Sequence, residues 1–275
     1  MSSDTLPLTT RDEFQEHCRA RASALYVGGG TLLCRVMGRF LCYVDSGDAS
    51  VAPHLAMDGF WEAWNTVALA RYVQPGWRVV DVGANHGYFT LLLASLVGPA
   101  GRVFAIEPNP RLFALLERTV RMNGYDDRVT LLSCAAASCD ATGELRVPSG
   151  FSGDGSVVLR GERDGTRWPV ERRRLDGIID GPVDFVKIDA EGADYDALEG
   201  ALGLLPAERP AAVLLEHQAR FHANPSAHLQ QLVEAGFSVQ YVTHDGDLVA
   251  ANPELLAGEP ERFWDVWLTR GPRLD

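Results

Sequence analysis

The chain has 275 residues, 46% of them hydrophobic and 23% charged, which is typical of a globular protein that buries a core. Its net charge of −12 argues against nucleic acid as a partner, because phosphate binding requires a positive surface. The apolar runs are too short for a membrane span, and the sequence does not open with a basic region followed by an apolar one. The five cysteines lack the spacing of a zinc site, which favours reduced thiols. Together these features lead us to expect a cytoplasmic protein without a membrane partner.

The first 58 residues are predicted to form an appendage. Residues 1–24 show a weak helical periodicity, and residues 31–45 alternate as in a β-hairpin. A segment of this length is too short to bury a core alone. We expect it to cover a ligand site or to provide the contact of a homodimer, and we assign residues 59–275 to the main domain.

The main domain alternates strands with helices. This alternation predicts an α/β fold in which helices cover both faces of a mostly parallel sheet. A Gly-, Ser- and charge-rich excursion over residues 148–168 interrupts the pattern without marking a domain boundary. The expected strands are residues 79–82, 103–106, 128–133, 183–188, 211–215, 237–242 and 263–269, and the expected helices are residues 59–73, 89 onward, 109–123, 193–205 and 224–235.

The most informative stretch runs from Arg78 to Leu93 and reads RVVDVGANHGYFTLLL. A buried strand leads into a turn between Gly83 and Gly87, and an apolar helix follows. Such a turn brings backbone N–H groups and the positive end of a helix close to a ligand. The glycine spacing does not fit a dinucleotide fingerprint, and the Gly-Lys-Ser/Thr of a P-loop is absent. The spacing D-x-G-x-x-x-G is that of the first motif of methyltransferases that use S-adenosylmethionine (SAM).

An acidic residue ends the second expected strand. Glu107 follows residues 103–106, and Asn109-Pro110 then opens a helix. A carboxylate in this position can accept hydrogen bonds from both hydroxyls of a nucleoside ribose. The alternative is that Glu107 only caps the helix that starts at Asn109, and the glycine turn upstream favours the ribose.

Four segments together resemble the FkbM family of SAM-dependent methyltransferases. They are VVDVGANHGYFTLLLA, VFAIEPNP, LDGIIDGPVDFVKIDAEGADYDALEGA and RPAAVLLEH, and K-I-D-A-E-G with the downstream L-E-G is the most specific part. The resemblance extends from about Trp61 to the C-terminus. It implies a seven-stranded Rossmann-like sheet, SAM as cofactor and S-adenosylhomocysteine (SAH) as product. It also implies methylation of a hydroxyl on a natural product, polyketide or sugar in specialised metabolism, without identifying the acceptor.

Ligands of open α/β sheets bind beyond the carboxyl ends of the strands, which places these motifs around one crevice. We expect the two glycines to admit the methionine part of SAM, with polar contacts from Asn85 and Thr90. Glu107 is expected to bind the ribose, and the residues after the third strand are expected to lie beside the adenine. The predicted cofactor-binding residues are Asp81, Gly83, Ala84, Asn85, Gly87, Tyr88, Thr90, Glu107, Pro108, Asn109, Ala135, Ala136 and Asp189.

Methylation of a hydroxyl also requires a base that removes its proton. His217 is the first candidate, because it follows an apolar strand directly and is expected at the rim of the crevice; a structural histidine paired with Glu216 is the alternative. Asp189 is the second candidate, and Glu191 is expected to hold the acceptor or to cap the next helix. The predicted substrate-binding residues are His86, Trp61, Trp64, Glu216 and His217, although both tryptophans could instead be packing residues.

A divalent metal ion is considered but not favoured. Carboxylates are the ligands that Mg²⁺ prefers, and Asp189, Glu191, Glu216 and His217 lie at neighbouring strand ends. Hydrogen bonding explains acidic strand ends equally well, so no metal site is predicted.

Three other functions stay open. An N-methyltransferase acting on an amino sugar or another amine is hardly separated from the first hypothesis by the sequence. A NAD-dependent oxidoreductase is disfavoured by the missing glycines and by the lack of a Tyr-x-x-x-Lys pair. A non-catalytic SAM-binding module would keep the glycine turn and Glu107 and lose only turnover.

Overall fold

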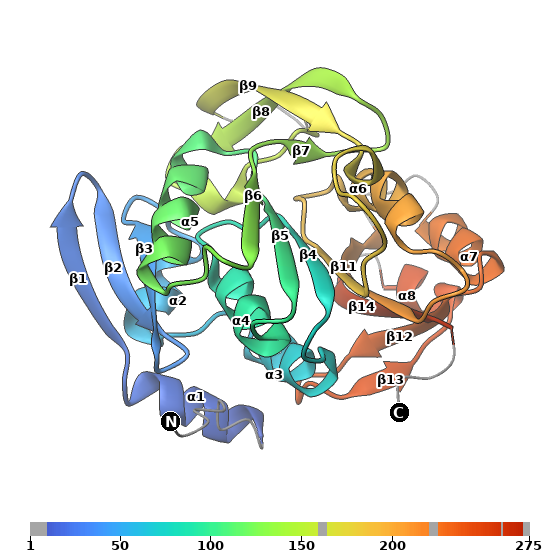
Figure 1. The fold of residues 1–275 in the computed structure, drawn as a ribbon, viewed down its shortest axis with the longest axis horizontal. Coiled ribbons are helices and arrows are strands. Elements are labelled where there is room, and N and C mark those ends of the chain that lie inside the picture. Colours follow the sequence, from blue (N-terminus) through green and yellow to red (C-terminus); the bar gives the residue numbers. More distant parts are fainter. Residues whose placement is uncertain (1–9, 159–163, 220–224, 260, 272–275) are drawn as a thin grey trace.

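An eight-stranded sheet forms the centre of the fold (Figure 1). The computed structural model describes residues 10–158, 164–219, 225–259 and 261–271. In spatial order the strands of this sheet are β13 (Leu248–Ala250), β12 (Ser238–Val242), β14 (Phe263–Arg270), β11 (Ala211–Gln218), β10 (Phe185–Ile188), β4 (Arg78–Val82), β5 (Arg102–Ile106) and β6 (Val129–Leu132). All seven strands predicted for the main domain belong to this sheet, and the eighth, β13, is an edge strand that the sequence pattern did not indicate.

The strand order reverses between β4 and β10. The strands from β11 to β6 run parallel, whereas β14 runs antiparallel to both β11 and β12. The chain passes from β4 to β5 and β6, and later places β10 on the other side of β4, with Lys187 opposite Asp81. Ligands of such sheets bind at the switch point, beyond the carboxyl ends of the strands. The predicted α/β fold with a mostly parallel sheet is confirmed.

Helices cover both faces of the sheet. Successive side chains of a strand point to opposite faces, so Val79 packs into a core with α3, α4 and α5 and Val80 into a core with α6, α7 and α8. Asn109 caps α5 as its sequence predicts, because its side chain accepts a hydrogen bond from Arg111 N at 3.0 Å. In the described part of the chain, no helix combines the length and the apolar content needed to cross a membrane. The helices are α3 (Ala63–Tyr72), α4 (Tyr88–Val97), α5 (Pro110–Met122), α6 (Asp194–Ala201), α7 (Pro225–Glu234) and α8 (Pro253–Ala257).

The N-terminal segment forms a second sheet beside α5 (Figure 1). The predicted hairpin is present as β2 and β3, and β3 is held to α5 by Tyr43 N, which donates to Thr119 Oγ1 at 2.9 Å. The predicted helix is shorter than expected, since residues 23–28 form a strand, and residues 1–9 lie outside the described residues. The division at residue 58 stays a prediction. The elements are α1 (Arg11–Arg19), β1 (Ser23–Gly28), β2 (Thr31–Val36), β3 (Phe40–Asp45) and α2 (Ala52–Met57).

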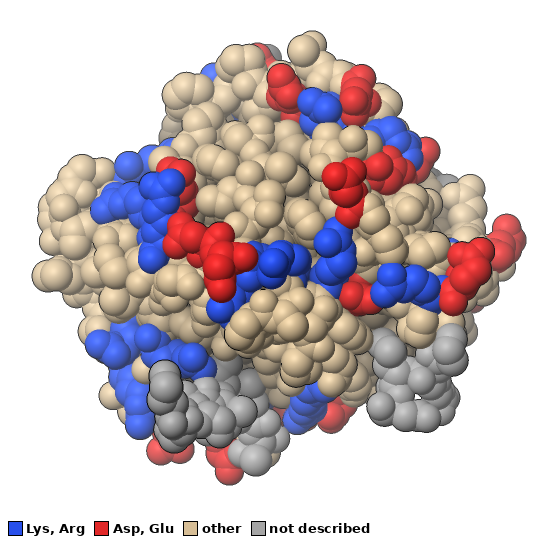
Figure 2. Space-filling view, viewed as in Figure 1, with Lys and Arg blue, Asp and Glu red and all other residues tan. Residues whose placement is uncertain are grey.

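A third small sheet precedes β10 and flanks the excursion; its strands are β7 (Ala135–Ala136), β8 (Ala141–Pro148) and β9 (Gly165–Arg173). Arginines near it are paired with acids, for example Arg172 with Asp196 at 2.5 Å and Arg174 with Asp176 at 2.6 Å. Basic and acidic side chains alternate over the face shown in Figure 2.

Candidate active site

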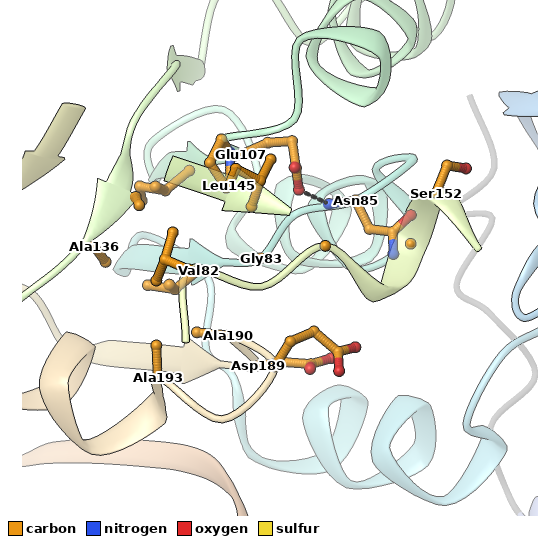
Figure 3. Close-up of a pocket in the computed structure, with 17 residues that line it drawn as sticks. Val82, Gly83, Asn85, Glu107, Ala136, Leu145, Ser152, Asp189, Ala190 and Ala193 are labelled. Carbon is orange, nitrogen blue, oxygen red and sulfur yellow. Dashed lines mark hydrogen bonds between the residues drawn. The ribbon is translucent and has the colours of Figure 1, made fainter. Parts of the chain in front are cut away.

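A cavity of about 600 Å³, partly open to solvent, lies at the switch point beyond β4, β5 and β10 (Figure 3). We call it the main cavity. Its walls come from the ends of these strands, from β7 and β8, and from the segment that follows β8. The lining residues are Val82, Gly83, Asn85, Ile106, Glu107, Pro108, Ala135, Ala136, Leu145, Ser152, Gly153, Gly155, Val157, Asp189, Ala190, Glu191 and Ala193.

Gly83 sits where the turn after β4 crosses the end of β10. Its φ is +75°, and a Cβ atom here would lie 1.8 Å from the carbonyl oxygen of Asp189. The amides of Gly83 and Ala84 both donate to Ile106 O at 3.0 Å, which ties the turn to β5. Only glycine permits this backbone conformation and this close approach. The turn therefore fixes the ends of β4, β5 and β10 relative to one another.

Glu107 lies on one side of the Gly83 turn and Asp189 on the other (Figure 3). Glu107 is 5% exposed, and its carboxylate accepts hydrogen bonds from Asn85 N and Asn109 N, each at 2.8 Å. Burial raises its pKa to about 7, although the two N–H donors oppose the shift. Each carboxylate oxygen can accept one more hydrogen bond. The carboxylate can therefore keep its two backbone N–H donors and also bind both hydroxyls of a ligand diol.

Seven of the predicted cofactor residues line the main cavity: Gly83, Asn85, Glu107, Pro108, Ala135, Ala136 and Asp189. The other six predicted cofactor residues do not line the cavity but lie behind its walls. Thr90 Oγ1 donates to Asp81 Oδ2 at 2.6 Å, Tyr88 Oη bonds Thr66 at 3.0 Å, and Gly87 packs against α5. Ala84 and Asn109 are buried in the turn and the helix cap.

A second, smaller cavity adjoins the first at Asp189. We call it the acidic cavity; it encloses about 240 Å³, part of which is open to solvent. Lys187 Nζ pairs with Asp189 Oδ2 at 3.2 Å and is 3% exposed. The lining residues are Glu62, Asn65, Lys187, Ile188, Asp189, Leu214, Glu216 and Asp265.

The carboxylates of the acidic cavity hold their protons more tightly than usual. Burial, together with the charges of Asp265 and Asp189, raises the pKa of Glu62 to about 8. Burial and neighbouring acids also raise the pKa of Glu216 to about 10. Desolvation disfavours the charged form of an acid, and each ionised neighbour adds to that cost. Burial therefore favours the protonated, neutral forms of Glu62 and Glu216 in the free protein.

The structure does not place His217 at the rim of the crevice. His217 is 0% exposed, and its Nδ1 lies 2.9 Å from Tyr195 Oη on α6. Because neighbouring residues of β11 point to opposite faces, Glu216 lines the acidic cavity and His217 packs behind the sheet. The expected placement of His217 was therefore wrong, whereas Asp189 lies where both cavities meet.

Three other expectations also change. Glu191 lines the main cavity but does not cap α6; Asp194 accepts from Ala190 N at 2.7 Å and Gly192 N at 3.0 Å instead. Trp64 Nε1 donates to Asp265 Oδ2 at 2.8 Å and so supports the acidic cavity, although Trp64 does not line it. Trp61 packs against His54 with ring centroids 5.2 Å apart. His86 is 1% exposed and lines neither cavity.

Several lining residues were not predicted. Ser152, Gly153 and Gly155 reach the main cavity from the Gly- and Ser-rich excursion, whose composition was the only signal. Glu62 and Asp265 belong to the acidic cavity, and an acid within the apolar strand FWDVWLT was the available clue for Asp265. In the described ranges, no group of three or more His, Cys, Asp or Glu residues is placed to hold a metal ion.

The model of the FkbM methyltransferase domain matches residues 81–239, which is more than half of the chain. The chain belongs to the FkbM family of SAM-dependent methyltransferases. The match begins at Asp81, within β4, and ends in β12, so it contains Glu107, Asp189 and Glu216. Glu62, Asn65 and Asp265 lie outside the matched range.

Relatives of this FkbM-family chain align with it over parts of their length. Methyltransferase sdnD of Sordaria araneosa is 28% identical over 154 residues, which covers 44% of this chain and 59% of that protein. Protein-L-isoaspartate O-methyltransferase of Aeropyrum pernix is 48% identical over 52 residues, covering 19% of this chain and 20% of that protein. The solved structure of PH0793 from Pyrococcus horikoshii has a TM-score of 0.50 at 14% identity, with 89% of this chain and 72% of that one covered. This structural likeness shows the fold alone.

The main cavity fits SAM by the chemistry of its walls. Glu107 offers carboxylate oxygens suited to a ribose diol, and Val82, Ile106 and Leu145 provide apolar surface suited to a base. Asp81 Oδ1 is buried beside the turn and accepts no hydrogen bond from the residues that the structure describes. This oxygen could accept a hydrogen bond from the ammonium group of the methionine part of SAM, either directly or through a water molecule.

Proposed function

We propose that this protein is a SAM-dependent O-methyltransferase that modifies a hydroxyl of a small molecule. The observation that carries the proposal is the buried Glu107 carboxylate facing the main cavity beside the Gly83 turn. The family supports methyl transfer, and the meeting of two cavities at Asp189 supports an acceptor placed next to the cofactor. The net charge of −12 supports a small acceptor over a nucleic acid.

We assign the SAM contacts to residues of the main cavity. Glu107 binds the ribose hydroxyls, the apolar wall from Val82 and Ile106 to Leu145 covers the adenine, and the Gly83 turn borders the methionine part. When bound, SAM supplies a methyl group that a hydroxyl oxygen takes as the new C–O bond forms and the C–S bond breaks, with the bonding electrons staying on sulfur. The protein's main contribution is alignment, which can supply about 7–11 kcal/mol of the barrier.

Asp189 takes the role of base in this proposal in place of His217. Its Oδ2 is paired with Lys187, and within the described residues its Oδ1 accepts no hydrogen bond. Oδ1 is therefore available to accept the hydroxyl proton during transfer. A base in this position contributes about 10²–10⁴-fold to the rate.

Methyl transfer from labelled SAM tests the proposal directly. The purified protein is incubated with labelled SAM and a panel of hydroxylated small molecules, and mass spectrometry locates the added methyl group. Calorimetry with SAM, SAH and NAD runs in parallel. We expect binding of SAM and SAH and a mass gain on oxygen. Binding of NAD without SAM, or SAM binding without transfer to any member of the panel, would contradict the proposal.

A further inference from the structure

Four carboxylates line the acidic cavity, and they come from separate parts of the chain. Glu62 precedes α3, Asp189 and Glu216 lie at the carboxyl ends of β10 and β11, and Asp265 lies in β14. Of the described residues that line this cavity, Lys187 alone is basic, and it already pairs with Asp189. Three carboxylates consequently face the cavity without a basic partner among its lining residues.

Asn65 gives an independent indication of what the cavity binds. Its side chain is 2% exposed, and Nδ2 donates to Glu62 Oε2 at 2.9 Å and to Asp265 Oδ1 at 2.7 Å. In this orientation Nδ2 points at both carboxylates. Asn65 Oδ1 is then a buried acceptor for which the described residues provide no donor. A buried acceptor in a cavity wall calls for a donor from a ligand or water.

We propose that the acidic cavity binds the protonated amino group of the methyl acceptor, which is therefore an amino alcohol or an amino sugar. This inference rests on the proposed function, since it names the substrate class of the same site. An ammonium group brings three N–H donors and one positive charge. It thus offers a donor to the Asn65 oxygen and offsets the excess of carboxylates along the cavity wall.

The position of the acidic cavity separates recognition from methylation. Asp189 lines both cavities, so an acceptor anchored by its ammonium extends past Asp189 toward the main cavity. A protonated amine has no lone pair and cannot take the methyl group, whereas a hydroxyl of the same molecule can. The amino group is therefore the anchor and the hydroxyl is the methylated atom.

The arrangement suits an organic ammonium better than a metal ion. The described residues include no group of three or more acidic, histidine or cysteine side chains placed to hold a metal. Burial of an ammonium among carboxylates also favours their ionised forms, so binding at neutral pH is expected to release protons that Glu62 and Glu216 hold in the free protein. Proton release is a signature that a purely structural cluster would not give.

The test uses ethylammonium chloride as the probe and calorimetry as the measurement, on the full chain saturated with SAH. Titrations in two buffers of different ionisation enthalpy report proton release, and potassium chloride at the same ionic strength is the salt control. Glu216→Gln is the test variant, because Glu216 lines the acidic cavity and glutamine keeps its shape while removing the charge, so the fold should stay intact. Glu254→Gln, an exposed acid of α8, is the matched control.

We expect ethylammonium to bind wild type and Glu254→Gln with proton release, and to bind Glu216→Gln about tenfold or more weakly. Binding no different from potassium chloride, or equal binding to Glu216→Gln, would overturn the inference. A transfer assay separates this inference from the proposed function. If SAH binds and simple alcohols are methylated as efficiently as matched amino alcohols, the proposed function stands and the ammonium anchor is wrong. If SAH does not bind, the proposed function fails whatever the ammonium titration shows.

Discussion

A Cβ atom on Gly83 would stand 1.8 Å from the carbonyl oxygen of Asp189, so the turn after β4 and the end of β10 leave no space between them. This contact joins the cofactor loop to the residue proposed as base. Any side chain at position 83 must push Asp189 away or displace the turn. The alignment of the main cavity with the acidic cavity depends on that contact.

Gly83→Ala is expected to destabilise the protein and to impair SAH binding, and Gly76→Ala provides the control. Both glycines have positive φ, +75° and +86°, but a Cβ on Gly76 would meet no atom within 4 Å. Both variants carry the left-handed strain of about 1 kcal/mol. Overlap with Asp189 should cost Gly83→Ala about 2 kcal/mol more. Urea unfolding and SAH calorimetry measure this difference, and equal losses in the two variants would show that the contact is unimportant.

Asp189→Asn is expected to lower turnover by about 10²–10⁴-fold while SAH affinity changes little, because the amide keeps the shape but cannot take the hydroxyl proton. Glu191→Gln, in the same loop, should have a far smaller effect, since Glu191 is exposed and lines the main cavity alone. Thermal unfolding of both variants controls for the lost ion pair with Lys187. Normal turnover of Asp189→Asn would remove this residue from the role of base.

His217→Phe should reduce stability and leave catalysis intact. The variant removes the partner of Tyr195 Oη in a fully buried position, which is expected to cost about 1–3 kcal/mol. The double variant with Tyr195→Phe separates the contribution of the Tyr195–His217 bond from that of the other contacts of His217. Denaturant unfolding and kcat measured on the same samples are the readouts. A large fall in kcat at unchanged stability would restore His217 as the base.

The residues on the cofactor side of the site were predictable from the sequence because each lies next to a recognisable strand. The Gly83 turn and Glu107 each follow directly from a strand, and a strand end fixes where the next residues lie. The face on which His217 lies was not predictable, because β11 is buried on both sides and its apolar run carries no alternation. The acidic cavity was hidden for another reason: Asn65 and Asp265 are hydrogen-bonded across 200 residues of sequence.

The pKa of Glu107 predicts how the free protein responds to pH. Its pKa is raised from the ordinary 4.5 to about 7, so between these values the folded protein keeps a proton that the unfolded chain has lost. The folded state is therefore progressively destabilised as pH rises from about 4.5 to 7. SAH binding should show the opposite trend and strengthen with pH through about 7, because the ionised carboxylate accepts the ribose hydroxyls best. Denaturant unfolding and calorimetry across pH 5–8 measure the two slopes, and parallel slopes would contradict this assignment.

The most direct test of the account is SAH calorimetry on wild type and Glu107→Gln at pH 8, with unfolding curves to confirm that both are folded. The account predicts one SAH bound per wild-type chain and an affinity about 10- to 100-fold weaker for Glu107→Gln, because a charge-assisted hydrogen-bond acceptor of the ribose is lost. No SAH binding by wild type, or equal affinity for Glu107→Gln, would contradict the claim that this carboxylate holds the cofactor.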